Sequence, residues 1–312
     1  MDWLYVVLGL VILLLAGDSL VKGAVNLSLR LGVPALIVSL TIVAFGTSAP
    51  ELLVSVSAIL DGVAGLALGN VVGSNTANIL LVLGVPAIIS VMHTSEHDTR
   101  VSFVQMIGAS LLFIVLCSFG TIEWWSGLIL LAALAAMLIH AARESLRHQK
   151  ATALAAADGE DEIEGADPDL GWSKILIFLV LGLIGLPLGA ELLVSGSVNI
   201  ARAWGVSETA IGLTLVAVGT SLPELATTVM AAIRRQADVA IGNVIGSNMF
   251  NLLGIIGVAA LVGPIPVDPS FFERDLWVML GASLLLIPFV FLGKDIGRTW
   301  GIVLSTLYLA YL

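Results

Sequence analysis

Residues 44–51 read AFGTSAPE, and residues 69–78 read GNVVGSNTAN. The same pattern returns at 217–224 as AVGTSLPE and at 242–251 as GNVIGSNMFN, always 173 positions later. Between 44–84 and 217–257, 20 of the 41 aligned residues are identical. The identities include proline, glutamate and asparagine, which chance similarity between two apolar segments would not produce. The chain therefore contains an internal duplication, and its most similar part is polar.

The composition is that of a polytopic membrane protein. The 312 residues are 58% hydrophobic and only 12% charged, against about 25% charged residues in soluble domains. Many stretches approach the roughly 20 apolar residues that cross a bilayer, and their lack of period-2 alternation favours helices over a barrel. The single cysteine, Cys117, excludes an intrachain disulfide and a cysteine metal cluster. We therefore expect an all-α membrane protein.

Hydropathy predicts ten transmembrane helices, five in each half of the chain. The predicted spans are 3–27, 34–60, 64–91, 101–119, 122–143, 173–200, 207–233, 237–262, 274–292 and 296–312. Residues 1–143 and 173–312 then form two five-helix repeats. The polar segment 144–172 joins them and is interpreted as a solvated linker, with a calcium-sensing segment as the alternative. A calcium-binding loop of the D-x-D-x-D-G type is not found there.

The basic residues predict the orientation. With ten spans, 11 of the 13 lysines and arginines fall on one side, and only Arg202 and Arg274 fall on the other. Positive charge marks the cytoplasmic side, so the linker is predicted to be cytoplasmic and both termini to face outside. Because five is an odd number, the second repeat enters the membrane from the opposite side. The prediction is therefore two inverted-topology repeats, whose interface is the expected place for a substrate site.

The duplicated motifs place ionisable and polar groups in the middle of apolar spans. Placing the ionisable side chains of Glu51 and Glu224 inside a membrane costs free energy unless each faces a cavity or a cation. Thr47 and Glu51 share a helix face, because they are four residues apart. Pro50 cannot donate a backbone hydrogen bond, so the helix is expected to break there and to free carbonyl oxygens near 44–46. A similar loosening is expected at 73–75.

The donor set indicates the kind of ion. Carboxylate, amide, hydroxyl and carbonyl oxygens are hard ligands that suit sodium, calcium or magnesium, and several flexible oxygens favour Ca²⁺ over Mg²⁺. Two carboxylates balance one divalent cation. The four asparagines at 70, 75, 243 and 248 have a structural alternative, in which they support the helix bends without touching an ion.

These motifs, GTSxPE with GNxxGSNxxN twice, resemble the repeats of the sodium/calcium exchangers in the cation/calcium antiporter superfamily, and the chain is similar to small prokaryotic members. The resemblance implies a diamond of cation sites between four central helices. It implies that Glu51 and Glu224 bind both Ca²⁺ and Na⁺. The other implied ligands are Thr47, Thr220, Ser48, Ser221, Ser74, Ser247, Asn78, Asn251 and the carbonyls of Ala44 and Ala217. Several relatives, among them the potassium-dependent branch, carry aspartate where this chain has Asn251, which argues against potassium co-transport.

The sequence thus predicts a secondary antiporter that exchanges Na⁺ for Ca²⁺ by alternating access. Two alternatives remain open: a proton-driven calcium antiporter and, in another class, a calcium channel. Signatures of a hydrolase or an ATP-driven pump are not found, so no enzyme activity and no cofactor are expected. The expected partners are the transported ions and the lipid bilayer, with no nucleic acid and no obligate protein partner. The expected location is a prokaryotic inner membrane.

Overall fold

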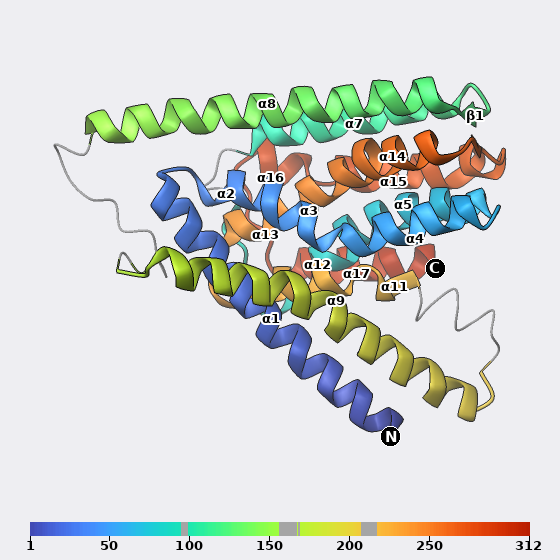
Figure 1. Cartoon of the computed structure of the whole chain (residues 1–312), viewed down its shortest axis with the longest axis horizontal. Helices are drawn as coiled ribbons and strands as arrows, with labels where there is room; N and C mark the ends of the chain where they lie inside the picture. The colour runs from blue at the N-terminus through green and yellow to red at the C-terminus, as the bar shows by residue number, and fades with distance from the viewer. Residues whose placement is uncertain (95–98, 156–166, 168, 207–216) are drawn as a thin grey trace.

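The protein is described by a computed structural model that covers residues 1–94, 99–155, 167, 169–206 and 217–312. Long helices lie side by side in a bundle, and two further helices cross it obliquely (Figure 1). The first half contains α1 (Asp2–Leu31), α2 (Ala35–Val38), η1 (Ser39–Val43), α3 (Ala44–Thr47), α4 (Ala49–Leu60), α5 (Ala64–Ala77), η2 (Asn78–Val82), α6 (Gly84–Ile89), α7 (Arg100–Cys117), β1 (Thr121–Ile122) and α8 (Trp124–Ala155). The second half contains α9 (Trp172–Ala203), α11 (Ala217–Gly219), α12 (Leu222–Ile233), α13 (Ala237–Met249), η5 (Phe250–Ile255), α14 (Ile256–Val262), β2 (Ile265–Pro266), η6 (Phe271–Asp275), α15 (Leu276–Leu284), α16 (Ile287–Phe291) and α17 (Arg298–Tyr311).

Seven of these helical stretches are long and apolar enough to cross a membrane, and a bent pair over 35–60 makes an eighth. They match eight of the ten predicted spans. The predicted span 207–233 begins in residues outside the described part of the chain, and its visible helix α12 has 12 residues. The helix of the last predicted span, α17, has 14 residues. The helical membrane fold is therefore confirmed, whereas the number ten stays a prediction.

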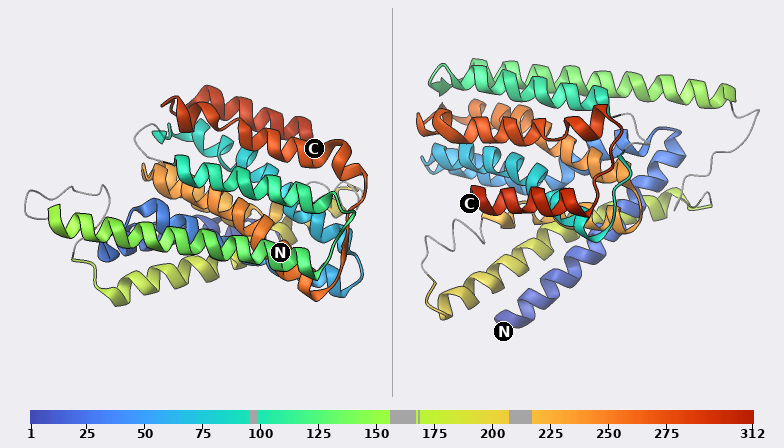
Figure 2. Two further views of the ribbon diagram at one scale, coloured as in Figure 1. Left: turned by 90° about the horizontal axis from the view of Figure 1, so that it is seen from above. Right: turned by 180° about the vertical axis from the view of Figure 1, so that it is seen from behind.

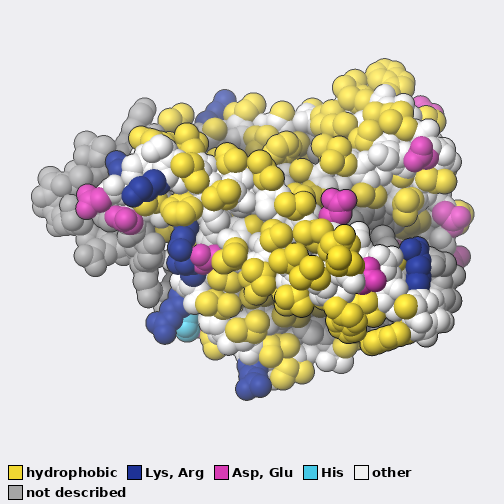
Figure 3. All heavy atoms as spheres, turned by 60° about the horizontal axis from the view of Figure 1, so that its bottom comes forward, with side chains coloured by type: hydrophobic (Ala, Val, Ile, Leu, Met, Phe, Trp, Pro, Cys, Tyr) yellow, Lys and Arg dark blue, Asp and Glu magenta, His cyan; other side chains and the backbone are white. Residues whose placement is uncertain are grey.

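The surface of the bundle is apolar where a bilayer would contact it. Large hydrophobic side chains are exposed on most helices, among them Leu53 at 70% and Leu15 at 67%. Figure 3 shows such side chains over much of one face of the molecule, with some charged groups among them and others around the edge. Because a soluble protein rarely exposes so large an apolar surface, this face is the one that lipid covers.

The predicted helix breaks are present in both halves. Between α3 and α4 the chain leaves the helical conformation at Ser48, whose φ and ψ are −85° and 5°, and the two helices meet at a bend of 43°. Ser221 has almost the same dihedral angles, −85° and 4°, between α11 and α12. Pro50 and Pro223 stand two residues later, in the first turn of the following helix, where proline is tolerated.

The predicted loosening at 73–75 is wrong. Helix α5 continues through these residues, and α13 continues through 246–248. The second-half glycines serve close packing instead, because a Cβ atom on Gly246 would lie 2.4 Å from the Leu40 carbonyl oxygen. The irregularity comes later, as the π-helical turns η2 and η5, which hold Asn78 and Asn251. A π-turn is common at functional positions and changes which way the following side chains point.

Helices α1 and α9 form a closely packed pair that runs obliquely to the other helices (Figures 1 and 2). Small residues allow their backbones to approach, since a Cβ on Gly182 would lie 2.9 Å from the Leu20 Cα and one on Gly189 would lie 2.9 Å from the Leu13 nitrogen. Close approach through glycine is typical of helix pairs in membranes, where no hydrophobic effect drives the helices together.

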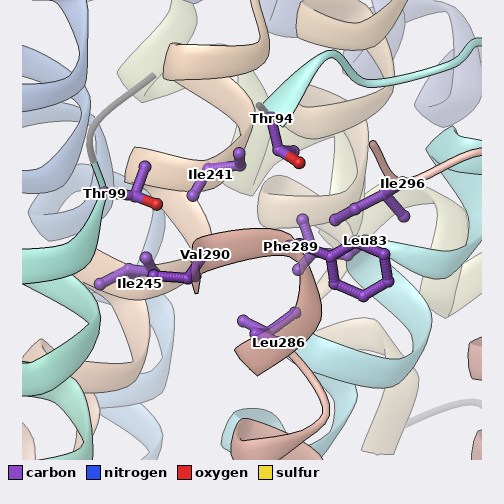
Figure 4. Close-up of a pocket in the computed structure, with 9 residues that line it drawn as sticks. All are labelled: Leu83, Thr94, Thr99, Ile241, Ile245, Leu286, Phe289, Val290 and Ile296. Carbon is purple, nitrogen blue, oxygen red and sulfur yellow. The ribbon is translucent and has the colours of Figure 1, made fainter. Parts of the chain in front are cut away.

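Two further features lie away from the centre. Helix α8 continues to Ala155, so the first part of the predicted linker is helical, and residues 156–166 and 168 lie outside the described residues. A cavity of about 10 Å³ is lined by Leu83, Thr94, Thr99, Ile241, Ile245, Leu286, Phe289, Val290 and Ile296 (Figure 4). That volume is about the room that one water molecule needs, and none of these residues was predicted to bind an ion.

Candidate cation site

The centre of the candidate site is a pair of buried carboxylates. Glu51 and Glu224 stand in the first turns of α4 and α12, and each side chain is 1% exposed. Ser48, three residues before Glu51, donates a hydrogen bond to the Glu224 carboxylate, so the two motifs meet. Among the described residues the two glutamates are the only fully buried charged side chains, and no lysine, arginine or histidine is buried with them. Two buried negative charges without a cationic side chain need a bound cation or protons for neutrality.

A hydroxyl group of the first repeat bonds to Glu224 of the second. Ser48 Oγ donates to Glu224 Oε1 over 3.2 Å. Thr47 Oγ1 also lies 3.2 Å from Asn243 Oδ1 and 3.4 Å from Ser247 Oγ. These contacts join the break after α3 to helix α13. The structure thus brings together four of the predicted ligands across the two repeats.

The corresponding hydroxyls of the second repeat are placed differently. Thr220 Oγ1 and Ser221 Oγ are buried and have no described hydrogen-bond partner. The backbone also differs, because the Ser48 N–H donates to the Ala44 carbonyl whereas the Ser221 N–H donates to the Val218 carbonyl. The Ala44 carbonyl accepts from Thr47 Oγ1 as well, at 3.3 Å. The prediction that the helix break frees this carbonyl of hydrogen-bond partners is therefore wrong. Ala217 is described only as the first residue of α11.

The amides Asn78 and Asn251 lie at equivalent positions of the two repeats and are 1% and 0% exposed. Each uses its NH₂ group in a bond to the other repeat, and each keeps an Oδ1 atom with no described partner. Glu51 Oε2 and Glu224 Oε2 share this property. Four buried acceptor oxygens therefore lack a donor, two from each repeat. Since buried polar atoms are almost always satisfied, this set is suited to coordinate a cation.

Ser74 and Ser247, also predicted as ligands, are 4% and 0% exposed. Ser247 contacts Thr47 as described above. Ser74 lies in α5 one turn before Asn78, so the two side chains share a helix face, as predicted. In the part of the chain that the structure describes, no hydrogen bond joins the Ser74 hydroxyl to the other predicted ligands, so helix α5 determines its position.

Asn70 and Asn243 make supporting bonds, in line with the structural alternative given for them, whereas their hydroxyl partners Ser55 and Thr228 were not predicted. Asn70 Nδ2 donates to the Glu51 carbonyl at 3.3 Å and to Ser55 Oγ at 3.2 Å, tying α5 to α4 beside the carboxylate. In the second repeat, Asn243 Nδ2 donates to Thr228 Oγ1 at 3.4 Å. Both pairs are separated by 15 residues. A hydroxyl four residues after each glutamate was the available signal, since it shares a helix face with that carboxylate.

A second charged group lies outside this cluster. Asp18 pairs with Lys22 one turn later at 3.1 Å, and this i, i+4 spacing places both side chains on one face of α1. Arg234 at the end of α12 also contacts Asp18, which the sequence did not predict. This pair joins α1 to α12.

The comparisons agree with this geometry. A family model described as sodium/calcium exchanger protein matches residues 1–142 and 174–312. The putative antiporter CaxA of Alkalimonas amylolytica is 35% identical over 99% of this chain and 96% of its own length. The sodium/calcium exchanger MaX1 of Methanosarcina acetivorans is 34% identical over 100% of this chain and 97% of its own. A solved structure of the sodium-calcium exchanger NCX_Mj, soaked without Na⁺ and Ca²⁺, superposes with a TM-score of 0.79 at 32% identity, covering 99% and 97% of the two chains.

Proposed function

The chain belongs to the sodium/calcium exchanger family of multi-pass membrane proteins, and from this premise we propose that it exchanges Na⁺ for Ca²⁺ by alternating access. The observation that carries the proposal is the set of four buried oxygens without a donor, at Glu51, Glu224, Asn78 and Asn251. The set carries two negative charges and consists of hard ligands. One Ca²⁺ or two Na⁺ would neutralise it.

Further Na⁺ would bind at neutral ligands next to the carboxylates. Ser48 already donates to Glu224, and the hydroxyls of Thr47 and Ser247 lie 3.4 Å apart. Thr220 and Ser221 hold buried hydroxyls without a described partner. Together with Ser74 and the carbonyls of Ala44 and Ala217, these groups supply the oxygens that flanking sodium sites need. Many hydroxyl and carbonyl ligands would be superfluous for a proton-driven exchanger, which is why we propose Na⁺ as the counter-ion.

The proposal includes the topology. Ten spans in two inverted repeats would place residues 144–172 in the cytoplasm and both termini outside an inner membrane. A cysteine introduced at position 159 should then react with an impermeant thiol reagent only from the cytoplasmic side, and one at position 61 only from outside, in a Cys117→Ala background. Labelling of both positions from the same side would contradict this arrangement.

The counter-ion is tested by measuring ⁴⁵Ca²⁺ uptake into proteoliposomes that contain the purified protein. The vesicles are loaded in turn with Na⁺, K⁺ or protons, and the membrane potential is clamped. Uptake driven by internal Na⁺ alone supports the proposal, and empty liposomes serve as the control. Uptake driven only by a proton gradient would assign the chain to the proton-coupled alternative. Uptake that needs no internal counter-ion would indicate a channel.

A further inference from the structure

Two asparagines that are not among the predicted ligands form reciprocal bonds at the contact between the repeats. Asn75 Nδ2 donates to the Asn248 carbonyl at 3.1 Å, and Asn248 Nδ2 donates to the Asn75 carbonyl at 3.3 Å. Their side chains are each 1% exposed. They lie on α5 and α13, three residues before Asn78 and Asn251.

The reciprocal bonds fix which way both amides face. A backbone carbonyl can only accept a hydrogen bond, so the atom that each asparagine presents to it must be the NH₂ nitrogen. Asn248 Nδ2 also lies 3.8 Å from the sulfur of Met106, a second weak acceptor. The amide oxygens therefore face the other way: Oδ1 of Asn75 faces Asn251, and Oδ1 of Asn248 faces Asn78.

The side-chain oxygens of Asn75 and Asn248 in turn orient the amides of the candidate ligands Asn251 and Asn78. Asn251 Nδ2 donates to Asn75 Oδ1 at 3.0 Å, and Asn78 Nδ2 donates to Asn248 Oδ1 at 3.0 Å. If Asn251 turned its amide over, two oxygens would meet and its NH₂ would occupy the present place of Oδ1. The bond thus holds Oδ1 of Asn251, and likewise that of Asn78, as a buried acceptor without a described donor.

We propose that Asn75 and Asn248 are positioning residues for cation binding: each fixes the amide of a ligand on the opposite repeat, Asn75 acting on Asn251 and Asn248 on Asn78. This inference rests on the proposed function, because it takes the two oxygens as cation ligands. A cation gains from this arrangement because the coordinating oxygens are oriented before it arrives. Without the bond, a free amide can turn a donor toward the ion, which repels it.

The test is a double-mutant cycle on Ca²⁺ affinity, measured with ⁴⁵Ca²⁺ by equilibrium dialysis of the purified full chain in detergent. Asn75→Ala should weaken binding about tenfold, within the usual range of coupling between contacting residues. Asn251→Ala should weaken it at least as much. The Asn75→Ala/Asn251→Ala double variant should bind no more weakly than Asn251→Ala alone, because Asn75 then has no ligand to orient.

The matched control is the pair on one helix. The fold-losses of Ca²⁺ affinity caused by Asn75→Ala and by Asn78→Ala should multiply in the double variant, since no described bond joins Asn75 to the Asn78 side chain. If Asn75 only held the helices together, the loss of Ca²⁺ affinity in Asn75→Ala would multiply with the loss in Asn251→Ala as well as with that in Asn78→Ala. That result would overturn the proposal. The mirror cycle uses Asn248→Ala with Asn78→Ala, and Asn75→Ser provides a milder variant if the alanine variant does not fold.

Failure of the proposed function gives a different result. Wild-type Ca²⁺ binding is measured first, and a chain that binds Na⁺ but no Ca²⁺ would contradict calcium exchange. The same cycle is then run with ²²Na⁺. If Na⁺ affinity shows coupling only between Asn75 and Asn251 and between Asn248 and Asn78, the positioning role is still supported. If these pairs show no coupling, the positioning role is contradicted.

Discussion

The two copies of the GTSxPE motif have nearly the same sequence and different hydrogen bonds. In the first copy Thr47 and Ser48 bond to groups of the other repeat, including the carboxylate of Glu224. In the second copy the hydroxyls of Thr220 and Ser221 are buried without a described partner. Both copies break the helix with the same dihedral angles. The motif therefore determines the local backbone and the ligand chemistry, and the neighbouring helix determines which hydroxyls are engaged.

This difference has a meaning for an exchanger. In many transporters built from repeats, alternating access is largely a rocking of one repeat against the other around a fixed site. The structure has one copy whose hydroxyls bond to the other repeat and one copy whose hydroxyls have no described partner. Under the proposed mechanism, the two copies would exchange these environments. Variants of equivalent residues in the two halves can therefore test which properties are shared and which are not.

The largest effect is expected where the copies are alike. Glu51→Gln and Glu224→Gln should each reduce Na⁺-driven ⁴⁵Ca²⁺ uptake by about 100-fold or more, because a divalent ion keeps only one formal counter-charge in a buried site. The measurement is uptake into proteoliposomes, with elution as a folded species in size-exclusion chromatography as the control. Wild-type-like uptake by either variant would remove the carboxylate pair from the site.

A second, smaller effect is expected from a third carboxylate. Asn251→Asp should retain Ca²⁺ binding but make exchange pH-sensitive or K⁺-sensitive by about tenfold, because the added charge takes up a proton or an extra cation. Initial uptake is measured between pH 6 and 8, with and without K⁺. The variant Asn78→Asp is the matched comparison in the other repeat. A flux that ignores both pH and K⁺ in the two variants would show that these positions do not share the charge of the site.

The hydroxyl groups should separate the two copies. Ser48→Ala removes a hydrogen bond to a carboxylate, which contributes about 1.5–3 kcal/mol to stability, and it should lower the apparent melting temperature in ion-free detergent by a few degrees. Ser221→Ala removes a hydroxyl without a described partner and should leave that temperature nearly unchanged. Equal shifts in the two variants would mean that the asymmetry does not exist in solution.

The smallest effect is expected at the ion pair that only one half possesses. Asp18 pairs with Arg234, whereas their counterparts in the duplication, Glu191 and Asp61, are both acidic and exposed. Asp18→Asn should destabilise the protein by at most about 1 kcal/mol, less at high salt, and Glu191→Gln should have no effect. Thermal melts at two salt concentrations measure this. A destabilisation by Asp18→Asn that does not depend on salt would contradict an electrostatic origin.

Much of the site was predictable because it depends on covalent geometry and composition. Pro50 cannot donate a backbone hydrogen bond, so the break before it follows from local chemistry, and Glu51 in an apolar span already implies a cation. The role of Gly246 was not predictable, because it depends on the approach of Leu40 from another helix. The reciprocal bonds of Asn75 and Asn248 and the contact of Arg234 with Asp18 depend likewise on how distant segments meet.

The reciprocal asparagine contact also bears on the ancestry of the chain. Asn75 donates to the Asn248 carbonyl as Asn248 donates to that of Asn75. In the same way, Asn78 donates to the Asn248 side chain as Asn251 donates to that of Asn75. This is the pattern of an isologous interface, in which two identical subunits present one patch to each other about a two-fold axis. The π-turns stand at nearly equivalent places in both copies, as two descendants of one duplicated segment would have them. The asparagine contact thus has the form that a homodimer of a half-length chain would have, with the paired residues on its symmetry axis.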